Sequence, residues 1–453
     1  MSRLNSSVSL GTRPIGKLLM EYAIPSIIAM TAASLYNMID SIFIGHGVGP
    51  LAISGLALTF PLINLGAAFG SLVGVGASTL VSVRLGQRDY DTAQRVLGNV
   101  VVLNLLIGLA YMVPLLLFLD PILHFFGGSD ATVPYAREYM QIILLGNVVT
   151  HLYLGLNAVL RASGHPRRSM MATIFTVVLN TILDPLFIYV FDWGIRGAAI
   201  ATVLSQLVVL LWQFKLFCNP GELLHFHRGV FRLRRKIVTD SLLIGLAPFL
   251  MNLAATLIVI LINRSLKTHG GDLAIGAYGI VNRLAFFILM IVIGLNQGMQ
   301  PIAGYNYGAG LYDRVKKVLL ITIVAATVVT TTGFLVGQFC PELAVSLFTS
   351  DEALKALSAH ALGIVTVCFP LIGFQMVTSN FFQNIGIAGK SIFLSLTRQV
   401  LILIPCLLIF PQWWGQMGVW VSLPVSDFMA SLIAGTMLCH QLILLGRAKV
   451  PER

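Results

Sequence analysis

Four oxygen-bearing side chains lie within long apolar stretches of the first half of the sequence: Asp40, Asn180, Asp184 and Thr202. Asn180 and Asp184 are four residues apart, so a helix places both on one face. Two carboxylates with amide and hydroxyl oxygens form a hard-oxygen site that suits a small cation. Alternatively, two neighbouring carboxyl groups share a proton, because burial and like charge oppose ionisation of both. Either chemistry can couple the entry of an ion to the exit of another solute.

The second half of the sequence has a different set of buried polar candidates, namely Arg283, Arg398 and Asp427. Charges inside an apolar environment usually pair. We place Arg283 and Asp427 at a similar depth, about 15 Å from the outer surface. We therefore expect a structural ion pair between them, with a role in substrate binding as the alternative. Amides in two predicted spans either line a cleft or join helices to one another: Asn296, Gln297, Gln300, Gln375, Asn380, Gln383 and Asn384.

A further group of side chains could line a cleft for bulky apolar cations. Methionine surfaces suit promiscuous binding because their flexible side chains repack. The alternative is that these residues pack helices together or face lipid, as most apolar residues of such a chain must. The proposed cleft group consists of Tyr36, Met38, Phe60, Phe287, Met290, Gln297 and Gln300.

The composition defines the elements that must position these residues. Hydrophobic residues make up 57% of the 453 residues, charged residues make up 10%, and the mean hydropathy is +0.87. A soluble chain carries about a quarter charged residues, whereas a membrane-spanning helix needs about 20 apolar residues. We predict an all-α membrane protein with twelve spans: 17–45, 51–83, 93–119, 132–161, 168–191, 195–217, 238–263, 272–304, 314–339, 354–384, 390–410 and 416–445.

Lysine and arginine indicate how these spans are oriented. The sequence contains 29 such residues and has a net charge of +11. Alternate connections hold most of them, and the opposite connections hold only Arg137, Arg196, Arg264, Lys267 and Lys355. Positive residues favour the cytoplasmic side, so we predict that both termini lie in the cytoplasm. Membrane orientation therefore explains the basic charge better than binding to nucleic acid does.

The predicted spans divide into two similar halves. Gly76, Gly86 and Gly164 recur as Gly298, Gly308 and Gly386, each displaced by 222 positions. An even number of spans in each half makes the two halves parallel repeats. We predict an N-terminal lobe (1–217), a cytoplasmic linker (218–237) and a C-terminal lobe (238–453). The basic charge of the linker is an orientation signal in our preferred interpretation and an anionic-lipid contact in the alternative one.

Several features narrow the class of protein further. The five cysteines are scattered without metal-ligand or disulfide spacing. Arg13 and Lys17 precede an apolar stretch that is too long for a cleavable signal, so we expect the first span to remain in the mature protein. Metalloprotease, nucleophile-elbow and P-loop motifs are absent from the sequence. We therefore predict a non-enzyme without a cofactor, a monomer that moves small molecules using an ion gradient or the substrate gradient alone.

Several stretches resemble the multidrug and toxic compound extrusion (MATE) family across essentially the whole chain. They are Asp40-Ser41-Ile42-Phe43-Ile44-Gly45, Gly76-Ala77-Ser78 with Arg84-Leu85-Gly86, Asn180 to Asp184-Pro185, and Gln297-Gly298-Met299-Gln300-Pro301. The resemblance implies a transporter of the bacterial inner membrane that exports organic cations and other drugs in exchange for protons or sodium. It also implies a cation site at Asp40, Asn180, Asp184 and Thr202, which would hold the metal ion if sodium is the coupling ion.

One departure from the family pattern separates its branches. One branch uses acidic residues in spans 7 and 10, where this sequence has Asn252 and Gln375 as the nearest polar groups. This resembles the DinF-like branch. Two other functions stay open. A lipid-linked oligosaccharide flippase of the same superfamily would have more spans and a cationic cavity, and a passive channel would not need an acidic pair in one lobe.

Overall fold

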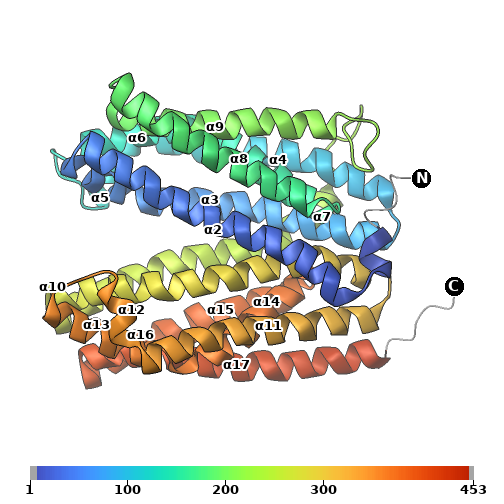
Figure 1. Ribbon diagram of the computed structural model, residues 1–453. Coiled ribbons are helices and arrows are strands. Elements are labelled where there is room, and N and C mark those ends of the chain that lie inside the picture. Colours follow the sequence, from blue (N-terminus) through green and yellow to red (C-terminus); the bar gives the residue numbers. More distant parts are fainter. Residues whose placement is uncertain (1–7, 448–453) are drawn as a thin grey trace. The chain divides into compact units, whose positions relative to one another are not determined.

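The computed structural model describes residues 8–447, except for the side chains of Asn37, Met38, Ser41, Gly45, Pro50, Ile53, Asp272 and Arg447. Within this range the regular structure is helical throughout (Figure 1). It contains 11 helices that are long and apolar enough to cross a membrane, or 12 when one bent pair counts as a single span. The prediction of an all-α membrane protein with twelve spans is confirmed.

The helices of the first half follow one another with short connections. They are α2 (Ile15–Gly47), α3 (Pro50–Gly86), α4 (Tyr90–Leu117), α5 (Leu119–Phe125), α6 (Val133–Leu145), α7 (Asn147–Ala162), α8 (Pro166–Pro185), the π-helical segment η1 (Leu186–Val190) and α9 (Gly194–Phe217).

The helices of the second half begin with one long run, α10 (Arg235–Gly308), which contains two predicted spans. Gly271 has φ 70° and separates them. The remaining elements are α11 (Tyr312–Phe339), α12 (Pro341–Ser346), α13 (Glu352–Val365), the 3-10 turn η2 (Thr366–Cys368), α14 (Phe369–Asn384), α15 (Ala388–Leu396), the π-helical segment η3 (Thr397–Leu403), α16 (Ile404–Trp414) and α17 (Gln416–Arg447).

The predicted span 132–161 is not a single straight helix. α6 and α7 meet at Gly146 with a bend of 53°. A Cβ atom on Gly146 would lie 2.3 Å from Val203 Cγ2, so the close approach of α9 accompanies the break. The turn η2 interrupts span 10 at the matching place in the second half, since Cys368 is displaced from Gly146 by the repeat distance of 222. The fourth helix is therefore irregular at matching positions in the two halves, with a bend of 53° in the first half and a 3-10 turn within a continuous span in the second.

Contacts divide the chain into two compact units that do not coincide with two continuous halves. Unit 1 contains Ile28–Phe249 and the short segment before Arg13, whereas unit 2 contains Arg13–Ile27 and everything from Leu250 onwards. Helices α2 and α10 therefore each contribute to both units. The chain changes unit close to Pro25 in α2 and close to Pro248 in α10. Proline removes a backbone hydrogen bond inside a helix, so both helices are weakened near the change of unit.

The first part of α2 packs in unit 2 and the first part of α10 packs in unit 1; we call these two segments the exchanged half-helices. Glycines allow them to pack closely within these units. In unit 1, a Cβ atom on Gly76 of α3 would lie 1.8 Å from the carbonyl oxygen of Ser241 in α10. In unit 2, a Cβ atom on Gly298 would lie 2.6 Å from Cα of Ala23 in α2. Small residues let helix backbones approach where lipid gives no hydrophobic drive. Gly76 and Gly298 are equivalent in the repeat, so each half uses the same glycine for this contact.

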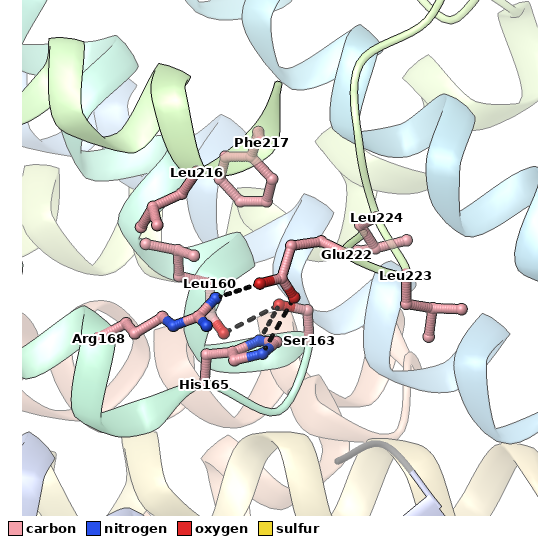
Figure 2. A pocket seen from close by; sticks show the side chains of 9 residues that line it. All are labelled: Leu160, Ser163, His165, Arg168, Leu216, Phe217, Glu222, Leu223 and Leu224. Atoms are coloured by element: carbon pink, nitrogen blue, oxygen red, sulfur yellow. Dashed lines mark hydrogen bonds and ion pairs between the residues drawn. The ribbon is translucent and has the colours of Figure 1, made fainter. Parts of the chain in front are cut away.

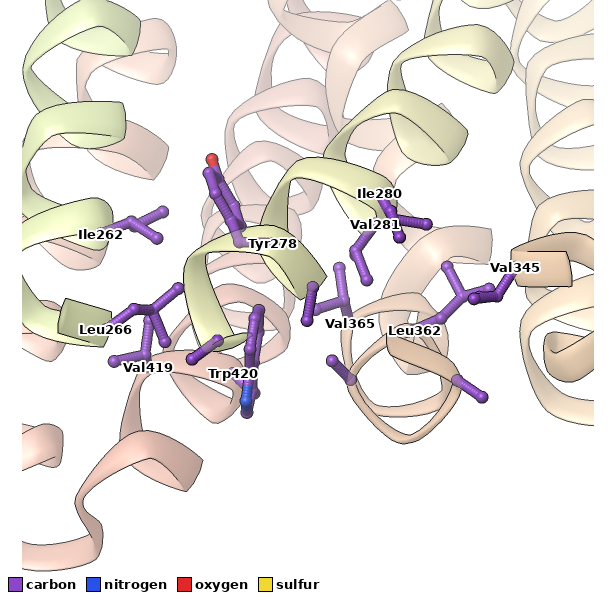
Figure 3. Packing of buried hydrophobic residues seen from close by; sticks show 14 of the residues in the cluster. Ile262, Leu266, Tyr278, Ile280, Val281, Val345, Leu362, Val365, Val419 and Trp420 are labelled. Atoms are coloured by element: carbon purple, nitrogen blue, oxygen red, sulfur yellow. The ribbon is translucent and has the colours of Figure 1, made fainter. Parts of the chain in front are cut away.

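Each unit also has its own apolar core. The core of unit 1 includes Ile44, Leu123 and Met140, all of which are fully buried. In unit 2, Trp420 of α17 packs near Tyr278 of α10, with ring centroids 6.4 Å apart (Figure 3). These cores hold the spans of each unit in fixed register, which positions the buried polar side chains described below.

The connection 218–234 is folded against one end of unit 1. Glu222 accepts a hydrogen bond from Arg168 of α8 over 2.6 Å, and its other oxygen lies 3.4 Å from His165 Nε2 (Figure 2). The small cavity around these groups is also lined by apolar side chains, including Leu160, Phe217 and Leu224. Burial, with help from the Arg168 charge and against the pull of Glu222, lowers the pKa of His165 below its usual 6.5.

Stability is expected to fall with acidification because of His165. Its pKa is lower in the folded chain than in the unfolded chain, so below about pH 6.5 the unfolded state binds the extra proton more readily. The contribution of neutral His165 to the free energy of unfolding is fully present above its pKa in the unfolded chain. It is lost as the pH falls through its pKa in the folded chain. Between pH 7.5 and pH 5, the unfolding temperature of the purified chain should fall further than that of the His165→Gln variant. Equal losses in both proteins would contradict this role.

Candidate functional site

Three helices of unit 1 bring the four predicted site residues together. Asp40 lies on α2, Asn180 and Asp184 lie one turn apart on α8, and Thr202 lies on α9. Their exposed fractions are 5%, 1%, 0% and 9%, so the site is buried. Buried ionisable groups within membrane spans are costly and usually functional.

The two carboxyl groups of the site lie close together. The side chains of Asp40 and Asp184 are near enough to interact with each other. A carboxylate only accepts hydrogen bonds, so a hydrogen bond between them requires a proton on one of the two groups. Asp40 Oδ1 has no hydrogen-bond partner among the described residues. The site therefore offers a carboxyl pair that is able to share one proton, together with one buried acceptor oxygen that lacks a partner in the described part of the chain.

Asn180 bridges the carboxyl pair to α9. In the amide orientation that satisfies both of its ends, Asn180 donates to Asp184 Oδ2 over 2.9 Å and accepts from the Thr202 backbone N–H over 3.2 Å. The Thr202 hydroxyl donates to the carbonyl oxygen of Ala198 over 3.1 Å. This network fixes the Asp184 carboxyl in position relative to both α8 and α9.

Two tyrosines complete the surroundings of the site. Tyr36 lies one turn before Asp40 on α2, and its hydroxyl lies 3.0 Å from Thr202 Oγ1. We predicted Tyr36 only as a cleft residue, whereas it also joins the polar network. Tyr139 of α6 was not predicted; it is 4% exposed and close enough to interact electrostatically with Asp40, Asp184 and Tyr36. A buried tyrosine hydroxyl usually has a polar partner. A tyrosine inside a predicted span was therefore the available signal in the sequence.

The backbone changes its winding directly after Asp184. Pro185 has no N–H, so the carbonyl group four residues earlier loses its usual helical donor. The following segment, Leu186–Val190, is π-helical. Such segments inside α-helices frequently mark functional sites. The aspartate thus lies where the helix is least constrained by its own hydrogen bonds.

The predicted cleft group is divided between the two units. Phe60 in unit 1 and Phe287 in unit 2 are exposed, with exposed fractions of 60% and 65%. Met290 and Gln297 are half-buried, and Gln300 is buried. The side chain of Met38 lies outside the described part of the chain. The assignment of this group to substrate binding remains a prediction.

The buried charges of unit 2 pair differently from our expectation. Arg398 Nε donates to Asp427 Oδ1 over 2.7 Å, and the Asp427 side chain is 6% exposed. Arg283 is exposed, so the predicted pair between Arg283 and Asp427 is wrong. Ser426 supports the observed pair by donating to the Arg398 carbonyl oxygen over 2.6 Å. The pair joins α17 to the π-helical segment η3.

Removing one partner of this pair should destabilise unit 2. Asp427→Ala leaves the Arg398 charge without its partner in an apolar environment, which typically costs about 3 kcal/mol or more. The double variant Arg398→Leu/Asp427→Leu should be more stable than Asp427→Ala, because it removes both charges. Thermal unfolding of the purified variants measures both values. A double variant less stable than Asp427→Ala would contradict this account.

These observations define a class of protein. A helical chain with two repeated sets of spans and a buried carboxyl pair in one of them is a membrane transporter. The MatE family model matches residues 25–186 and 244–408, and the chain belongs to this family of efflux transporters.

The similarity extends to curated proteins and solved structures. The chain is 28% identical to the multidrug export protein MepA of Staphylococcus aureus (strain NCTC 8325 / PS 47) over 424 residues, which is 93% of each chain. It is also 28% identical to MepA of Staphylococcus haemolyticus, covering 93% of this chain and 92% of the relative. A MOP superfamily transporter from Pyrococcus furiosus has a TM-score of 0.91 at 26% identity, covering 98% and 99% of the two chains. An outward-facing multidrug resistance MATE transporter has the same TM-score at 27% identity, with the same coverage.

Proposed function

We propose that this chain is a secondary active transporter that exports drug-like organic cations in exchange for protons. The observation that carries the proposal is the buried and adjacent Asp40–Asp184 pair, because two neighbouring buried carboxyl groups favour sharing one proton. The names of the curated relatives, which are multidrug export proteins, support the substrate class. The proposed location is the bacterial plasma membrane, with both termini in the cytoplasm because of the distribution of basic residues.

The shared proton gives the site two states that differ in charge. With the proton, the pair carries a single negative charge distributed over two carboxyl groups. Loss of the proton leaves two adjacent carboxylates in a buried environment, which is unfavourable unless a cation replaces it. Proton release towards one side and reloading from the other therefore changes the electrostatic free energy of the site at each step. This difference can drive a conformational change of the helices that carry the site.

Helices α2 and α10 are the segments that must bend in such a change. Each belongs to both units, and each has a proline close to the position where it changes unit. We propose alternating access by rocking of the two units, as parallel repeats in other transporters use. Asp40 lies on α2, so its protonation state acts directly on one of these helices.

Sodium is the second candidate for the coupling ion. The site offers carboxylate, amide and hydroxyl oxygens, and small hard cations prefer such donors. Asp40 Oδ1 is buried and lacks a hydrogen-bond partner within the described residues, so it could serve as a ligand. The same four residues would then bind sodium in place of the proton.

Transport by the purified chain in proteoliposomes tests the proposal. A proton gradient and a sodium gradient are imposed separately while a fluorescent organic cation is measured. We expect the proton gradient alone to drive accumulation against the substrate gradient. Accumulation driven by the sodium gradient alone would show that sodium, and not the proton, is the coupling ion. Export that is unchanged when both gradients are collapsed would contradict ion coupling, and passive equilibration would indicate a channel.

A further inference from the structure

The linker carries a concentrated basic surface with a defined position. Five basic side chains are all exposed: Arg228, Arg232, Arg234, Arg235 and Lys236. The single acidic residue of the segment 218–237 is Glu222, which is engaged by Arg168. On the neighbouring helix, Asp91 is held by Arg95 over 2.8 Å. Asp91 also interacts electrostatically with Arg234, but its main partner is Arg95. The surface formed by residues 228–236 therefore keeps a net positive charge.

The backbone beneath this surface is held by a buried asparagine. Asn99 of α4 is 1% exposed, donates to the carbonyl oxygen of Arg232 over 3.1 Å, and accepts from the Arg234 N–H over 3.2 Å. Val230 is fully buried, and a Cβ atom on Gly98 would lie 2.2 Å from its carbonyl oxygen. An orientation signal needs only charge. A backbone fixed by a buried side chain places those charges in a constant arrangement, as a binding surface requires.

Apolar side chains alternate with the arginines along the same segment. Phe231 and Leu233 are 43% and 44% exposed, although each lies between basic residues. Phe231 stacks on Phe226 with ring centroids 5.5 Å apart. Aromatic and apolar side chains next to arginines are typical of segments that lie in the headgroup region of a bilayer.

The chain connectivity places this segment at the membrane surface. It joins the last residue of α9, Phe217, to the first residue of α10, Arg235, and both helices are membrane spans. Hydrogen bonds from Gln94 and Asn99 to the linker keep it against the end of α4, which is a third span. The basic groups therefore lie where phospholipid headgroups lie.

We propose that residues 228–236 form a binding surface for the headgroups of anionic phospholipids. The arginines bind the phosphate oxygens, since the guanidinium group matches phosphate geometry with two donors. Phe231 and Leu233 contact the upper part of the acyl chains. Clusters of four to eight basic residues next to a span show this preference in general. Free phosphate would meet the same charges, but it would not use the two apolar side chains.

Native mass spectrometry of the full chain in mixed micelles tests this proposal. Phosphatidylglycerol and phosphatidylcholine are supplied in equal amounts, and the ratio of the two bound lipids is measured. We expect a strong preference for phosphatidylglycerol. In Arg232→Gln/Arg235→Gln this preference should fall roughly 25-fold, because each basic residue contributes about 1 kcal/mol and 1.4 kcal/mol is a factor of ten.

A matched variant controls for the loss of two positive charges. Lys316→Gln/Lys317→Gln removes the same charge from α11 and should keep the wild-type preference. Glycerol 3-phosphate, added at the concentration of the lipid, should not displace phosphatidylglycerol. The proposal would be overturned if both variants lost the preference for phosphatidylglycerol equally, or if the wild type showed no such preference. Displacement by glycerol 3-phosphate would also overturn it, by showing a site for soluble phosphate. Unchanged binding of phosphatidylcholine and an unchanged unfolding temperature show that the variant is folded.

Discussion

Replacing Asp184 by asparagine is expected to reduce ion-driven export to the background level while leaving the chain folded. Asparagine has nearly the same shape, so the buried site keeps its packing. It cannot release or rebind a proton, however, so the site loses one of its two charge states. The amide also carries no charge into the apolar interior, and stability should not fall. Gradient-driven transport in proteoliposomes and thermal unfolding measure these two quantities.

Asp192→Asn provides a matched control for this experiment. Asp192 is exposed and follows η1 in the same unit. Its φ is 55°, and asparagine tolerates this left-handed conformation as aspartate does. The control should transport at the wild-type rate. Full gradient-driven transport by the Asp184 variant would remove this residue from the coupling site, whereas an equal loss in the control would point to a general effect of charge.

Replacing Gly245 by alanine is expected to destabilise unit 1 strongly. A Cβ atom at this position of α10 would lie 1.7 Å from the carbonyl oxygen of Leu72 in α3, and this oxygen belongs to the backbone. Neither helix can yield by rotating a side chain, so the two helices must separate. Overpacking with side chains costs up to about 3 kcal/mol, and a clash with backbone should reach or exceed that value. The unfolding temperature and the yield of monodisperse protein report the effect.

Gly279→Ala is the appropriate comparison. Gly279 lies on the second span of α10, and no atom outside its own stretch of helix lies within 4 Å of the position that its Cβ would occupy. Alanine favours a helix over glycine by up to about 1 kcal/mol, so this variant should be as stable as the wild type or slightly more stable. If the two variants had the same stability, the close contact between α3 and α10 would not hold the unit together.

The number and order of the spans could be predicted from the sequence because lipid imposes a simple requirement. Each crossing needs a long apolar run, and basic residues mark the connections. The bend between α6 and α7 could not be predicted, because Gly146 resembles many other glycines within spans. Its role depends on the approach of Val203 from α9, which is a tertiary contact. The exchange of half-helices between the units has the same origin.

The candidate coupling site was predictable for a similar reason. Depth along a helix follows from 1.5 Å per residue, and four rare polar residues at one depth in neighbouring spans are informative. Depth alone was insufficient in the second half, where Arg283 and Asp427 have similar depth. Which residues meet also depends on rotation about the helix axis, and Arg398 of η3 faces Asp427 instead. Tyr139 was missed because its spacing resembles that of an ordinary packing residue.

The exchange of half-helices has a consequence for biosynthesis. Residues 13–27 are synthesised more than 200 residues before the rest of the unit with which they pack, which begins at Leu250. The first half of α2 must therefore wait in the bilayer until most of the chain has been translated. Unit 1, in turn, is complete only when the chain has reached Phe249, beyond the linker. A gene divided at the linker would thus encode two products that each lack one piece of their own packing, and neither should assemble independently of the other.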